Sequence, residues 1–419
     1  MIGRPPAYVP AAGRAALSNR LQSLASANVP VACGVYFNLA EPAGRSARHA
    51  EATYWIAHHL STGSATALPH FNTNPPPILR IVAAASRGRL DALCARMADL
   101  PDDLTTDLWR RIAALTDDPD GLTGTERRRA SDLMLRLGWL NAAADLLHMG
   151  AAETGLHVFT AESAIEELAV LFRRRHDIGV LEQRALAVAR DREYSPRVRY
   201  TMANFVVVRN GKRGTDTSAM HEAAEIAIAA VGEMDADPFE KHLAEQTVYR
   251  AVAFVPFVAG DAAGTLRALD QAEYHQLAAE PEAIGDLARL AWTDHAFPLH
   301  ETIARTHLRL GSTAAAVRAA ERITELSPND ARAWDLHGQA LLAAGRPHDA
   351  IDAYESALPI GGLPVAKAAF YLGWIHAQLG DRRAAQRYYT MSEAIDPTVP
   401  ALAGLIDSVR CGADDLGAA

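Results

Sequence analysis

The chain has 419 residues, of which 49% are apolar and 22% charged, and its formal net charge is −9. A chain of this length exceeds one simple globule and fits either several domains or one extended repeat array. The acidic balance argues against general nucleic-acid binding, which needs a basic face. Three lysines among 41 basic residues are typical of a GC-rich, bacterial genome.

The spacing of the cysteines and the pattern of hydrophobic residues exclude further classes of protein. Cys33, Cys94 and Cys411 form no CxxC pair, so neither a disulfide framework nor a zinc site is predicted. No apolar run approaches the roughly 18–20 residues of a membrane helix. The first 22 residues contain arginines and prolines but no continuous hydrophobic core of a signal peptide. We therefore expect a cytoplasmic protein without membrane association.

The first 77 residues differ from the remainder. We expect a flexible lead-in over Met1–Arg20, and a buried strand or an irregular packed segment over Val29–Leu39. Helical periodicity predicts a helix over Ser46–Leu60. Ser61–Pro77 ends in three prolines, which cannot continue a helix, so it is a predicted loop. We expect residues 1–77 to pack on the rest of the chain, because VACGVYF is too apolar to stay in water.

From Ile78 onward the sequence predicts helices. Apolar residues recur at spacings of three and four, and no convincing alternating strand pattern occurs. Asn210–Gly211 and Gly260–Asp261 are expected to form turns between antiparallel helices. We interpret residues 78–297 as degenerate helical repeats, and a distinct helical domain is the alternative.

The last third of the chain repeats itself. Gly311, Gly345 and Gly380 stand 34 and 35 residues apart. A repeating helical unit cannot bury its apolar face alone, so such units must stack. The positions five and nine residues after each glycine hold small or aromatic residues: Ala316, Ala350 and Ala385, then Ala320, Tyr354 and Tyr389.

This pattern resembles the tetratricopeptide repeat family, whose unit is a 34-residue helix–turn–helix. The middle repeat matches it at Trp334, Gly338, Gly345, Ala350, Tyr354 and Ala357, and the last repeat at Leu372, Gly373, Gly380, Ala385, Tyr389 and Pro397. The resemblance is specific over residues 298–402. It implies an all-α fold, an α-solenoid of antiparallel helix pairs. Small residues then let the two helices of a repeat approach closely, and an aromatic ring fills the gap between repeats. We expect three parts: residues 1–77, 78–297 and 298–419, the last with three repeats and a capping helix.

The resemblance also implies a concave groove lined by the first helix of each repeat. A solvated helix face is the alternative; Phe370 and Trp374 argue against it unless they pack on a capping helix at Ala401–Val409. Arginine pairs bidentately with carboxylates, so the groove suits an extended peptide with acidic and apolar groups. The carboxylate-clamp set of the family is missing, so a chaperone tail is not implied. The predicted groove residues are Glu301, Arg305, Arg309, Arg332, Asp335, Gln339, Lys367, Phe370, Trp374 and Gln378.

Sixteen histidines prompt a search for metal sites. His49, Glu51, His58 and His59 lie on one predicted helix and form a possible 2-His-1-carboxylate set. No HExxH pair occurs there, so surface histidines on an amphipathic helix are the favoured interpretation.

A second acidic and histidine-rich region lies on two neighbouring predicted helices. His221–Glu225 and His242–Glu245 lack the Glu-x-x-His pairs of a di-metal bundle, so such a site is not favoured. Phosphate-binding loops and a nucleophile elbow are also missing from the sequence. We therefore expect no cofactor.

The sequence predicts a non-catalytic scaffold that binds another protein or a peptide. Self-association is left open, and neither a nucleic-acid nor a membrane partner is expected. One alternative is a metal-dependent enzyme with its site at His49, Glu51, His58 and His59. A second is a peptide-sensing regulator, although residues 1–77 show no convincing DNA-binding helix-turn-helix.

Overall fold

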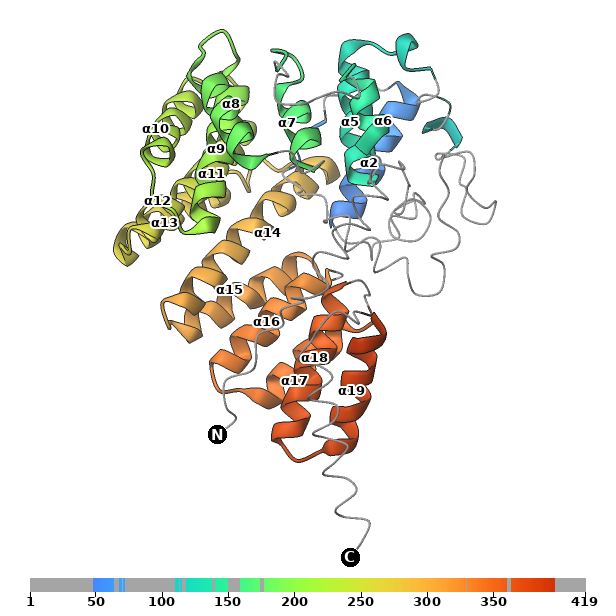
Figure 1. Ribbon diagram of the computed structural model, residues 1–419, viewed down its shortest axis with the longest axis vertical. Helices are drawn as coiled ribbons and strands as arrows, with labels where there is room; N and C mark the ends of the chain where they lie inside the picture. The colour runs from blue at the N-terminus through green and yellow to red at the C-terminus, as the bar shows by residue number, and fades with distance from the viewer. Residues whose placement is uncertain are drawn as a thin grey trace, which may run out of the picture. The chain divides into compact units, whose positions relative to one another are not determined.

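The computed structural model describes the chain in segments, and these contain helices but no strand (Figure 1). They fall into two compact units, and the last passage of the chain from one unit to the other lies within one helix, between Thr302 and Ile303. We call the unit that includes Thr106–Thr302 the upstream unit, and the unit that includes Ile303–Ala419 the repeat unit. The described residues are 48–63, 68–69, 71, 110–112, 114, 118–137, 140–149, 159–173, 177–328, 330–359 and 363–395.

The upstream unit is built from helices that pack on their neighbours in the chain, such as α8 on α9 and α9 on α10. The predicted helix at Ser46–Leu60 is confirmed as α2. In chain order the elements are α2 (Arg48–Thr62), the short 3-10 helix η4 (Pro119–Gly121), α5 (Gly124–Leu137), α6 (Leu140–Leu146), α7 (Ala164–Arg173), α8 (Ile178–Arg190), α9 (Pro196–Arg213), α10 (Ser218–Gly232), α11 (Pro238–Val252), α12 (Phe254–Val258), α13 (Ala262–Ala278) and most of α14 (Asp286–Arg309).

Helix starts in this unit follow from local side-chain chemistry. Ser195 and Asp237 each accept a hydrogen bond from a backbone N–H of the helix that follows, and a proline stands at the start of both helices. A capping oxygen satisfies an N–H that has no partner within the helix, and proline has no N–H to satisfy there. Asp261 caps α13 in the same way directly after Gly260, whose φ is 77°. The predicted turn at Gly260–Asp261 is therefore confirmed.

The turn predicted at Asn210–Gly211 lies three residues later, at Gly214. Both residues are buried within α9, which continues to Arg213 and ends at Gly214 with φ 68°. Gly211 serves packing, because a Cβ there would lie 2.5 Å from the ring of Phe254. The side chain of Asn210 donates to the carbonyl oxygen of Val206 at 2.9 Å, one turn earlier in the helix. Glycine and asparagine thus indicate a close helix contact here and not a break.

Within its described residues, the repeat unit contains the end of α14 followed by five helices. They are α15 (Thr313–Leu326), α16 (Ala331–Ala343), α17 (Pro347–Ala357), α18 (Leu363–Gln378) and α19 (Arg382–Ile395). The helices α16 and α17 form one packed pair, and α18 and α19 form the next (Figure 1). The three glycines of the sequence repeat, Gly311, Gly345 and Gly380, have φ of 76°, 72° and 85°. They end helices in the left-handed conformation that glycine adopts without strain.

The two helices of a repeat are in close contact at a glycine facing a tyrosine. A Cβ on Gly338 of α16 would lie 2.7 Å from the Tyr354 ring of α17, and one on Gly373 of α18 would overlap the Tyr389 ring of α19. Both tyrosine side chains are fully buried. Tyr354 also stacks on Tyr371 of α18, with ring centres 5.5 Å apart. Tyr354 therefore fills the gap to the next repeat, as the repeat pattern predicts.

Several predictions from sequence lie outside the described residues. These are the lead-in Met1–Arg20, the segment Val29–Leu39 and the capping helix Ala401–Val409. Among the helices that the structure does describe, none combines the length and apolar character needed to cross a membrane.

The glycine–tyrosine contact gives a direct test of the packing. Gly338→Ala introduces a methyl group against the Tyr354 ring, so we expect the free energy of unfolding to fall by about 1–3 kcal/mol, the usual cost of overpacking. Gly232→Ala is the matched control, because the space around Gly232 in α10 is open. Thermal unfolding followed by circular dichroism measures both variants. Equal midpoints for the two variants would contradict the packing described here.

Candidate functional site

Three polar side chains on α16 and α18 form a small connected cluster, which we call the α16–α18 cluster: Asp335, Gln339 and Lys367. One oxygen of Asp335, Oδ2, accepts from Lys367 Nζ at 2.8 Å and from Gln339 Nε2 at 2.9 Å. The Lys367 ammonium also lies 5.7 Å from the centre of the Tyr371 ring, within the range of a cation–π contact. The cluster therefore links the first helices of two successive repeats through charged groups.

The cluster stands out because the surrounding positions of α18 are apolar and buried. Only 9% of the Asp335 side chain and 23% of the Lys367 side chain are exposed. A partly buried ion pair loses hydration on folding, and the attraction between its charges offsets that loss only when their mutual geometry is good. The part of Lys367 that remains exposed gives this otherwise apolar region a cation that a partner can contact.

The remaining polar residues of the predicted groove lie in different surroundings. Arg305, Arg309 and Gln378 are exposed. Arg332 binds Asp330, the residue that caps α16, through both carboxylate oxygens. In the upstream unit, Glu301 acts on Arg250: burial lowers the pKa of this arginine to about 10, and the negative charge of Glu301 opposes that shift.

The two aromatic residues of the predicted groove are buried. Phe370 is fully buried, and its ring lies edge-on to Tyr371 and tilted against Tyr389. Trp374 is 5% exposed. Both rings pack inside the repeat unit. Their burial gives no support to the predicted contact with a peptide.

The histidine set near the N-terminus is described only in part. The rings of His58 and His59 have centres 6.1 Å apart, and Trp55 lies edge-on to both. The side chains of His49 and Glu51 lie outside the described residues. The metal site at these four residues, the less favoured alternative from the sequence, is not tested by the described residues.

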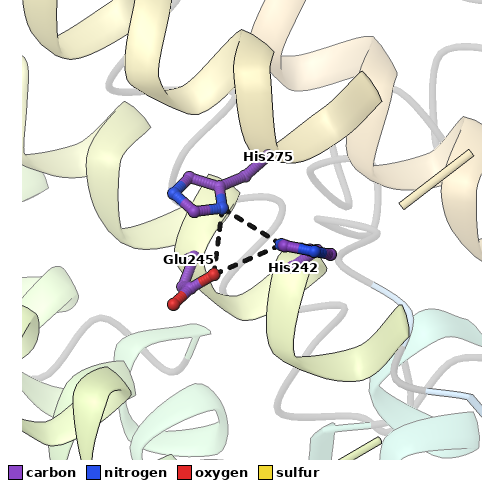
Figure 2. A group of neighbouring side chains, drawn as sticks. All are labelled: His242, Glu245 and His275. Atoms are coloured by element: carbon purple, nitrogen blue, oxygen red, sulfur yellow. Dashed lines mark hydrogen bonds and ion pairs between the residues drawn. The ribbon is translucent and has the colours of Figure 1, made fainter. Parts of the chain in front are cut away.

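A different group of ligand-type side chains meets in the upstream unit. His242 and Glu245 of α11 lie beside His275 of α13, and their side chains point toward one another (Figure 2). The i, i+3 spacing of His242 and Glu245 is visible in the sequence. His275 follows 33 residues after His242 on another helix, and no sequence spacing links it to the pair. Sequence reasoning therefore missed the third member.

The ion pair across α16 and α18 can be tested by removing its acid. Loss of one partner of a buried pair costs about 3–5 kcal/mol and of an exposed pair about 0–1 kcal/mol. Lys367 is partly exposed, so we expect Asp335→Ala to lower the free energy of unfolding by about 1–3 kcal/mol in denaturant titrations. The control is Glu325→Ala, which removes the partner of Arg322 on the exposed face of α15. Equal losses in both variants would contradict a stabilising role for the cluster.

Comparison with known proteins supports the repeat assignment. The family model described as tetratricopeptide repeat matches residues 302–364 and 336–400. Similar solved structures include one titled MamA AMB-1, with 18% identity, a TM-score of 0.31, and coverage of 46% of this chain and 98% of that chain. A structure titled MamA MSR-1 has 17% identity, a TM-score of 0.28, and coverage of 48% and 98%.

A third solved structure is the APC/C hetero-tetramer Cut9–Hcn1, with 13% identity, a TM-score of 0.26, and coverage of 73% of this chain and 80% of that chain. A comparison with curated proteins finds no match. The sequence identities and TM-scores of these solved structures are too low to transfer a function to this chain. The family match, the period of the glycines and the packed helix pairs agree, and residues 302–400 therefore belong to the tetratricopeptide repeat family.

Proposed function

We propose that the chain is a non-catalytic scaffold whose repeat unit binds a segment of another protein along the first helices of its repeats. The observation that carries this proposal is the α16–α18 cluster. It supplies hydrogen-bonding groups on the first helices of two successive repeats, where the neighbouring positions are apolar. Stacked repeats create extended surfaces of this kind, and a bound segment can contact several repeats at once.

The charges on the first helices favour a partner segment with acidic side chains. Arg305 and Arg309 lie one turn apart on α14 and are both exposed, so they share one face of that helix. Lys367 adds a cation on α18. Arginine binds carboxylates through two parallel hydrogen bonds. Because exposed charges are screened by salt, the interaction should weaken as ionic strength rises.

The packing of the repeat unit reduces the cost of binding. The tyrosine rings that fill the space between helices are buried, and left-handed glycines fix the turns. A surface that is already ordered in the free protein loses little conformational entropy when a partner binds. The same rigidity fixes the distance between the groups on α16 and α18.

Affinity capture from native lysate tests the proposal when it compares two matched charge reversals. In the first variant Arg305 and Arg309 of α14 are both changed to Glu. In the second, Arg318 and Arg322 of α15 are changed in the same way. All four side chains are exposed, so each variant alters the same charge without touching the core. Bound proteins are identified by mass spectrometry and quantified against the wild-type chain.

We expect the α15 variant to capture the same protein as the wild type, in a similar amount. The α14 variant should capture at least about tenfold less of that protein, because it loses one or two charged contacts. Recovery of the chain itself as the captured protein would identify a second copy as the partner. Equal retention by both variants would contradict binding along the first helices.

A further inference from the structure

His242, Glu245 and His275 place three potential metal-binding atoms in a small triangle (Figure 2). His242 Nδ1 lies 3.1 Å from His275 Nδ1, and Glu245 Oε2 lies 2.9 Å from His275 Nδ1 and 3.4 Å from His242 Nδ1. Within the part of the chain that the structure describes, this is the group of three such side chains whose ligand atoms converge.

The size of this triangle fits a first-row transition metal. Bonds of about 2.0–2.1 Å to nitrogen and oxygen place the ligand atoms about 3.3 Å apart in tetrahedral geometry and about 3.0 Å apart in octahedral geometry. The three observed separations span this range. An ion can therefore bind all three atoms with small adjustments of the side chains, while at least one coordination position stays open.

Hydrogen bonding within the group does not satisfy all three atoms equally well. A proton on His275 Nδ1 serves the contact with Glu245, the shortest edge of the triangle. His242 Nδ1 then faces both another ring nitrogen and a carboxylate oxygen at a longer distance. A neutral imidazole carries one N–H, so two rings and one carboxylate meeting at one point suit a shared cation better than a pairwise network.

The surrounding aromatic residues hold the ring of His275 in place. The Tyr249 ring stacks on the His275 ring with centres 5.4 Å apart and planes 5° apart, and Tyr274 packs edge-on against it.

The nearest cation in the sequence does not compete for this position. The Nζ atom of Lys241 donates to the carbonyl oxygens of Val231, Gly232 and Met234 at the end of α10. Glu245 thus supplies a negative charge next to two nitrogen ligands. Between 13% and 29% of each of the three ligand side chains is exposed, so an ion can reach the group from solvent.

We propose that His242, Glu245 and His275 bind a divalent first-row transition-metal ion that joins α11 to α13. Two imidazoles and one carboxylate are the donor set of catalytic zinc sites and of non-haem ferrous sites, whereas magnesium and calcium prefer sites made of oxygen alone. The site lies in the upstream unit, and its residues differ from the four N-terminal residues that the sequence offers as the less favoured metal site. An ion bound to three protein ligands retains a position for water or a substrate.

Metal binding to the full chain tests this inference. The protein is stripped with a chelator and titrated with zinc, with cobalt as a spectroscopic probe and with magnesium, in a competing buffer ligand that suppresses weak surface binding. We expect one equivalent of zinc and of cobalt to bind, visible d–d absorption of a cobalt ion with nitrogen and oxygen ligands, a raised thermal midpoint with zinc, and no binding of magnesium.

Substitutions locate the ion. Glu245→Gln keeps the shape of the side chain, and His275→Ala removes a nitrogen ligand; both should weaken zinc binding by more than about 100-fold, the upper range for loss of a group that only supports a ligand. His221→Ala is the matched control, because His221 contacts a single carboxylate, that of Asp216, on the exposed surface of α10. It should bind zinc as the wild type does.

Two results would overturn the inference. One is a wild-type chain that takes up no stoichiometric zinc or cobalt, a measurement that does not depend on any variant folding. The other is undiminished binding by Glu245→Gln with a circular dichroism spectrum matching the wild type, which would place the ion elsewhere on the chain.

Discussion

The structure of the repeat unit depends on the close approach of two helices across a glycine and a tyrosine. Gly338 and Gly373 leave room for the rings of Tyr354 and Tyr389, and any larger side chain would separate the helices. Tyr354 then reaches the next repeat by stacking on Tyr371. Because close-packed interiors resist even small changes in volume, this contact fixes the spacing of α16 and α18. That spacing in turn brings Lys367 within hydrogen-bonding distance of Asp335.

A fixed spacing between first helices gives the repeat unit a surface that exists before any partner arrives. Its charged groups sit on helices held by buried aromatic rings, and not on loops. A partner segment that matches this arrangement needs no rearrangement of the protein, so its binding energy is not spent on ordering the scaffold. The proposed function therefore depends on packing, and the charges select which segment binds.

The sequence predicted the repeat unit well because its features are local and periodic. Gly311, Gly345 and Gly380 mark turns, and φ is positive at all three.

The candidate site was harder to predict for two reasons. A repeat position tells which face a residue such as Phe370 occupies in the family, but its burial depends on the neighbouring helix and on Tyr389. The proximity of His275 to His242 depends on how α11 and α13 pack, which no spacing in the sequence encodes. The turn predicted at Gly211 is displaced to Gly214 for a related reason: a glycine needed for helix packing looks the same in sequence as one needed for positive φ.

Hydrogen exchange of the backbone amides, measured with and without a captured partner, tests whether the first helices of the repeats bind that partner. We expect the partner to slow exchange in α16 and α18 of the repeat unit, around Asp335 and Lys367, and to leave the second helices α17 and α19 less affected. Protection confined to the upstream unit, with exchange in α16 and α18 unchanged, would contradict it.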